Sequence, residues 1–244
     1  MNSKLKKAIK CSYEIPKPKR KEEFLSNLPY PKTRGQDFLR SQVGYIHKRV
    51  WVTSFILFIL ILVFCHSFKK DDLRILMAVS AMIPILTSVT VTEIIRSSVF
   101  GMDELEMTTR YNLRSLVLAR MGILGMGNML LLLLTIPVLS IRIEIESVWI
   151  GVYLLGPYLL TCFISFALIN RFRSNEITYY CAGAAVLVWC LELLLNYSRL
   201  TIYEPRYISL WLAILALLLI AFSKELHKYI KNTEELLWNS SLTV

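Results

Sequence analysis

Apolar residues occur along this chain in six runs, separated by short polar segments. The runs cover residues 50–68, 73–95, 116–139, 148–169, 177–195 and 208–222. A helix of about twenty apolar residues crosses the hydrocarbon core of a bilayer, and the short sixth run reaches that length with its flanking aromatic and basic residues. Backbone polar groups in lipid must be paired within the segment, so runs of this length favour helices over barrel strands. The pattern predicts an all-α polytopic membrane protein with six transmembrane helices.

The polar segments on either side of these runs predict three further parts. Residues 1–35 combine many basic residues with four prolines, which is typical of a largely disordered cytoplasmic tail. In 36–49 apolar residues recur at helical spacing, which predicts an amphipathic elbow helix at the membrane interface, leading directly into the first span. The transmembrane domain then covers 50–223, and a cytoplasmic C-terminal helix covers 224–244.

The positions of Lys and Arg predict which side of the membrane each end faces. Segments on the side of the two termini carry twenty-one of these residues, and the opposite loops carry six. Since cytoplasmic segments are enriched in Lys and Arg, both termini are predicted to be cytoplasmic, in a multi-pass protein of a bacterial cell membrane. The formal charge is +10, and beside a membrane bundle this excess indicates anionic lipids at the basic tail, not nucleic acid.

The charged segment between the second and third spans carries signals of a short helix. Asp103 can act as the N-cap, and Glu106 stands three residues later, where a capping box requires it. Met102 and Leu105 begin an apolar series at helical spacing that continues beyond Arg110. Two interpretations follow from this pattern, a docking helix for another protein or a solvated loop, and the cap and the length favour the docking helix.

The same region resembles the first cytoplasmic loop of exporter-type ABC permeases. In that family an arginine and a glycine precede a glutamate-leucine pair, and here these are Arg96, Gly101, Glu104 and Leu105, followed by 116–120. The resemblance implies a coupling helix that sits in a cleft of a separate ATP-binding subunit, which would bind ATP and Mg. It also implies a second permease subunit, identical or different, and agrees with an elbow helix before the first span.

Ionisable side chains inside the spans are the first candidates for function, since each costs about 2.5–3.5 kcal/mol at the centre of a membrane helix. Glu93 and Arg96 are one helical turn apart, which predicts a structural ion pair or a link to the docking helix. Arg120 is expected to snorkel to the cytoplasmic surface or to pair with an acidic residue of the loop. Glu192, near the outer end of the fifth span, either faces a translocation pathway or reaches interfacial water.

Small residues in the third and fifth runs predict close helix packing. They include Gly122, Gly125, Gly127 and Gly183, and a subunit interface is the alternative interpretation.

Motifs of catalysis and metal binding are missing from the sequence. There is no HExxH pair, no GxSxG elbow and no glycine-rich phosphate loop, and the five cysteines include no CxxC pair. We therefore expect neither catalysis nor a metal in this chain. The function predicted is the permease subunit of an ABC-type transporter, an exporter driven by a separate ATP-binding subunit. The alternative is a membrane-anchored regulator whose basic tail binds a cytosolic partner.

Overall fold

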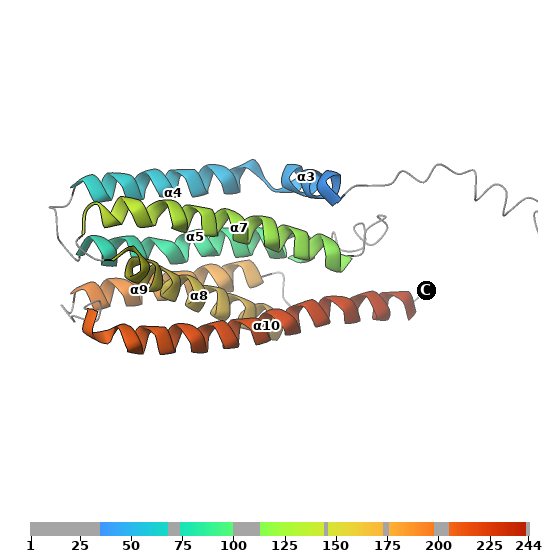
Figure 1. Ribbon diagram of the computed structural model, residues 1–244. Coiled ribbons are helices and arrows are strands. Elements are labelled where there is room, and N and C mark those ends of the chain that lie inside the picture. The colour runs from blue at the N-terminus through green and yellow to red at the C-terminus, as the bar shows by residue number, and fades with distance from the viewer. Residues whose placement is uncertain are drawn as a thin grey trace, which may run out of the picture. The chain divides into compact units, whose positions relative to one another are not determined.

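The computed structural model describes residues 35–67, 74–99, 113–143, 146–172, 176–197 and 205–242, and every regular element in these ranges is helical (Figure 1). Two short elements, α3 (Gly35–Tyr45) and the 3₁₀ helix η1 (Pro205–Tyr207), accompany six long ones. The long helices are α4 (Lys48–Ser67), α5 (Arg74–Val99), α7 (Leu113–Ser140), α8 (Ser147–Arg171), α9 (Ile177–Tyr197) and α10 (Ile208–Leu242).

All six long helices are long and apolar enough to cross a membrane. Their bounds contain or closely match the six apolar runs of the sequence, so the predicted all-α polytopic membrane fold is confirmed. The reason is physical: a helix pairs its own backbone groups, which is the requirement that hydrocarbon imposes on a single segment.

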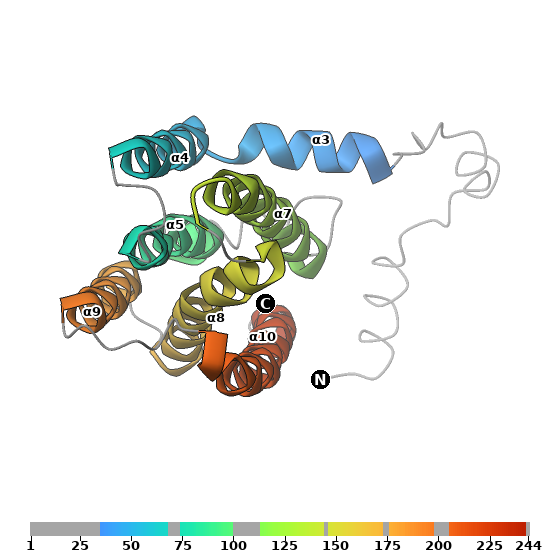
Figure 2. The ribbon, with the colours of Figure 1, turned by 60° about the vertical axis from the view of Figure 1, so that its left-hand side comes forward.

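Two helices, α5 and α8, form the centre of the bundle (Figure 2). α5 packs against α4, α7, α8 and α9, whereas α8 packs against α5, α7, α9 and α10. Within the apolar part of each helix, 67% of α5 is buried but only 6% of α10. The outer helices therefore direct most of their apolar surface away from the protein, as expected where the surrounding solvent is lipid.

Leu39–Val244 forms one compact unit with an apolar cluster toward each end of the bundle. One cluster surrounds Tyr153 of α8, whose ring meets Trp211 of α10 edge to face, with centroids 5.5 Å apart. The other contains Ile46, Val50 and Phe166. It lies at the end of the bundle where α3 meets α4, which we call the α3 end.

α3 and the first span, α4, do not form one continuous helix. α3 ends at Tyr45 and α4 begins at Lys48, so Ile46 and His47 separate them, and α3 runs at a marked angle to α4 (Figure 2). Gly44 stands just before the break, where its lack of a side chain weakens helical preference. α3 and α4 thus have different directions.

On the C-terminal side, by contrast, two elements predicted as separate form one continuous helix. The sequence predicts a sixth span at 208–222 and a separate helix from 224, but α10 continues without interruption to Leu242. No Gly or Pro lies between 208 and 242, so a change from apolar to charged residues alters what surrounds the helix and leaves its backbone intact.

Among the described glycines, the tightest contact falls at one that the sequence pattern did not single out. A Cβ added at Gly156 of α8 would lie 2.8 Å from Trp211 of α10. By contrast, Cβ atoms at Gly122, Gly125 and Gly183 would meet nothing within 4 Å. The prediction of close packing at these three glycines is therefore wrong for the described residues, because they face away from the neighbouring helices.

Candidate functional site

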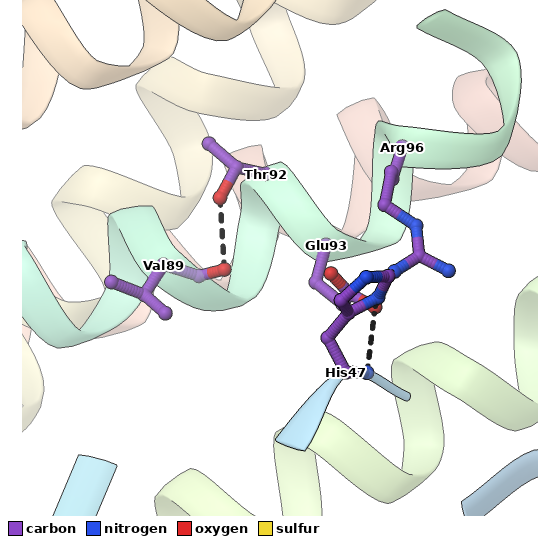
Figure 3. Close-up of polar contacts among 5 residues, drawn as sticks. All are labelled: His47, Val89, Thr92, Glu93 and Arg96. Carbon is purple, nitrogen blue, oxygen red and sulfur yellow. Dashed lines mark hydrogen bonds and ion pairs between the residues drawn. The ribbon is translucent and has the colours of Figure 1, made fainter. Parts of the chain in front are cut away.

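The residue that precedes α4, His47, is joined to α5 by a hydrogen bond. The backbone N–H of His47 donates to Oε1 of Glu93, 3.2 Å away (Figure 3). His47 directly precedes α4, where backbone N–H groups have no partner within the helix and carry partial positive charge. The Glu93 carboxylate thus caps α4 from a different helix.

The same carboxylate forms an ion pair on its own helix. Nη1 of Arg96 lies 2.9 Å from Oε1 of Glu93, at the i, i+3 spacing that the sequence indicated. Nη1 also lies 3.3 Å from Nε2 of His47, and Nδ1 of His47 is 3.6 Å from Glu93. A guanidinium only donates, so the neutral ring tautomer with its proton on Nδ1, facing the carboxylate, fits both distances.

Tyr45, the last residue of α3, lies between two guanidinium groups. Cζ of Arg120 in α7 is 4.3 Å from the ring centroid, and Cζ of Arg96 in α5 is 5.5 Å from it. Such cation–π contacts contribute about 0.5–2 kcal/mol, more when they are withdrawn from water. The ring therefore holds the end of α3 against both helices.

Arg120 does not reach the surface. Only 4% of the residue is exposed, and its charge lies within electrostatic range of Glu93. Snorkelling, the first alternative, is therefore wrong, because the guanidinium packs against the Tyr45 ring inside the bundle. The second alternative, an ion pair with an acidic residue of the loop, falls on residues outside the described ranges.

Four elements thus meet in one place, which we call the junction site. It consists of Tyr45, His47, Glu93, Arg96 and Arg120. The sequence pattern indicated Glu93, Arg96 and Arg120 as candidates, but not Tyr45 or His47. Their only signal was their position between the elbow helix and the first span, next to Gly44.

Glu192 occupies a different place in the bundle. It is 5% exposed, and its Oε2 lies 3.4 Å from Oγ of Ser80 in α5. Ser80 Oγ is also 2.9 Å from the Met77 carbonyl oxygen, to which it donates. The carboxyl group therefore lies inside the bundle between α9 and α5, and it is not part of the junction site.

The predicted docking helix, with Met102, Asp103, Glu104, Leu105, Glu106 and Arg110, lies outside the described residues. The structure does describe the two helices that flank it, α5 and α7. Both contribute side chains to the junction site, Glu93 and Arg96 from α5 and Arg120 from α7. The two helices on either side of this segment are therefore both in contact with α3 through Tyr45.

Among the described residues, no three His, Cys, Asp or Glu side chains are grouped so that they could hold a metal ion. Comparison of the chain with protein-family models, with curated proteins and with solved structures found no match.

Proposed function

We propose that this chain is the permease subunit of an ABC-type transporter, an exporter driven by a separate ATP-binding subunit. One observation carries the proposal: the junction site ties α5 and α7, which flank the charged segment 101–114, to the start of α4. The six spans, the elbow helix and the resemblance of the segment to a coupling helix support the same function.

In the proposed mechanism, the junction site transmits the movement of the ATP-binding subunits to the membrane spans. Closure of two ATP-binding subunits would move the segment 101–114, and α5 and α7 would move with it. Because Glu93 holds His47, and Tyr45 holds Arg120, this displacement reaches α4 and α3. Rocking of the spans between two states would follow, provided that nucleotide binds the two states with different affinity.

The proposed assembly contains a second permease subunit and two ATP-binding subunits in the cell membrane, with both termini of this chain in the cytoplasm. ATP and Mg belong to the partner, since the sequence lacks a phosphate-binding loop. The basic tail, residues 1–35, would lie against anionic lipids of the cytoplasmic leaflet.

The test is copurification with an ATP-binding protein encoded by a neighbouring gene, recognised by its GxxxxGK[ST] motif. Leu105→Asp should abolish recovery at matched membrane levels, because it places a carboxylate in an apolar interface. Glu104→Asp, which conserves charge, is the control and should leave recovery unchanged. Equal recovery of both variants and equal coupled hydrolysis would contradict the proposal.

Deletion of residues 1–32 separates this proposal from the membrane-anchored regulator. A permease should keep its ATP-binding partner and partner-stimulated hydrolysis after the deletion. Loss of a cytosolic partner on deletion, with no effect of Leu105→Asp, would favour the regulator.

A further inference from the structure

A groove lies between α4 and α7 near the α3 end, and the proposed function does not use it. Its cavity volume is about 380 Å³, within the roughly 300–1,000 Å³ range of ligand sites. Its walls are mainly apolar and aromatic, among them Trp51, Phe55, Ile123, Met126, Gly127 and Leu130. At Gly127 the backbone of α7 lies close to the Trp51 side chain of α4, since a Cβ added there would lie 3.6 Å from it.

Two of the few polar residues that line the groove, Asn128 and Thr90, form hydrogen bonds within the protein. Nδ2 of Asn128 donates to Oγ1 of Thr90, 3.1 Å away, and Oγ1 of Thr90 donates to the Thr87 carbonyl at 2.7 Å. A ligand that fills the groove therefore meets mostly carbon. An apolar cavity of this kind stays dry and is filled by apolar molecules.

The mouth of the groove opens toward the membrane. Met126 is 76% exposed, Phe55 62% and Leu130 57%, and all three stand in transmembrane helices, where exposed surface contacts lipid. Farther along α4 the packing closes, leaving a void of only about 20 Å³ beside Leu57 and Ile61. The groove is thus open to lipid on one side and ends within the bundle.

Positive charge gathers at the α3 end of the groove. Lys48 is exposed, one helical turn from Trp51. In the adjacent junction site Arg96 and Arg120 face one carboxylate, Glu93, so the described cations outnumber the anion. A phosphate headgroup placed here would meet an excess of positive charge while its chain entered the groove.

We propose that the groove between α4 and α7 binds one acyl chain of an anionic phospholipid from the leaflet at the α3 end. Its headgroup lies near Lys48. The lipid fills volume that would otherwise lack van der Waals partners, and the charge makes the site selective for anionic over zwitterionic lipid. This binding does not depend on the transport proposal.

Native mass spectrometry of the full-length protein tests the site, with phosphatidylglycerol and phosphatidylcholine of identical chains as probes. Wild-type protein should retain one phosphatidylglycerol after partial delipidation and should prefer it over phosphatidylcholine. Met126→Trp fills the mouth of the groove from the lipid side and should abolish this retention. Met129→Trp is the matched control, since Met129 is also exposed on α7 but does not line the groove.

Lys48→Gln separates headgroup recognition from chain binding. This variant should still retain a lipid, but its preference for phosphatidylglycerol should fall about fivefold, the factor expected for one cation at a membrane surface. Equal retention by Met126→Trp and Met129→Trp would overturn the proposal. So would a wild-type protein that retains no lipid, because another part of the chain then fills the groove, or one that retains both lipids equally.

Discussion

The backbone N–H of His47 and the carboxylate of Glu93 are 3.2 Å apart although 46 positions separate them in the chain. This contact fixes where the first span begins relative to the second. The side chain that provides it also pairs with Arg96, so one carboxylate serves both a helix start and an ion pair.

Replacing Glu93 with Ala should lower the stability of the bundle. The change leaves the His47 N–H without its acceptor and the Arg96 guanidinium without its carboxylate partner, a loss of about 1–3 kcal/mol. For a chain of this size that corresponds to roughly 2–12 °C in apparent melting temperature, measured in detergent. Glu93→Gln keeps an oxygen acceptor for the N–H and should lose less, and identical melting of wild type and both variants would contradict the assigned contacts.

The ring of Tyr45 should hold α3 against α5 and α7. Tyr45→Phe keeps the cation–π contacts with Arg96 and Arg120, so the amides of α3 should exchange more slowly than in a variant without the ring. Tyr45→Leu removes contacts of about 0.5–2 kcal/mol and should speed exchange roughly 2- to 30-fold. Fast exchange in the Phe variant as well would show that the hydroxyl group is the part that matters.

Gly156→Ala should destabilise the contact between α8 and α10. The added Cβ would lie 2.8 Å from the Trp211 ring, and overpacking of this kind costs about 1–3 kcal/mol. Trp211→Leu in the same chain provides room and should recover part of the loss, which a double-mutant cycle of melting temperatures measures. Gly183→Ala is the control because it meets no neighbour within 4 Å; a loss equal to that of Gly156→Ala would refute the steric explanation.

Topology follows from the unequal distribution of Lys and Arg. Reporter fusions after Lys70 and Asn196 should be active outside the cytoplasm, and fusions after Asn175 and Val244 inside it. An external signal from the Val244 fusion would rule out six spans with both ends in the cytoplasm.

The spans were predictable because length and hydropathy alone decide whether a segment can cross a bilayer. The break at Ile46 and His47 was not, since its stabilising partner, Glu93, lies on another helix. The position of Arg120 was missed for the same reason: snorkelling is the expectation for an isolated helix, and Tyr45 changes the outcome. Continuity of α10 could have been inferred from the lack of Gly and Pro, but the change in polarity at residue 223 suggested a boundary.

The length of α10 has a mechanical consequence. Its 35 residues extend over roughly 52 Å at 1.5 Å per residue, whereas the hydrocarbon core is about 30 Å thick. About 20 Å of the helix therefore stands beyond the core, and no hinge separates this part from the span. A tilt of the span would swing the free end as a rigid lever arm. A force applied to that end would in turn be delivered to α8, against which α10 packs.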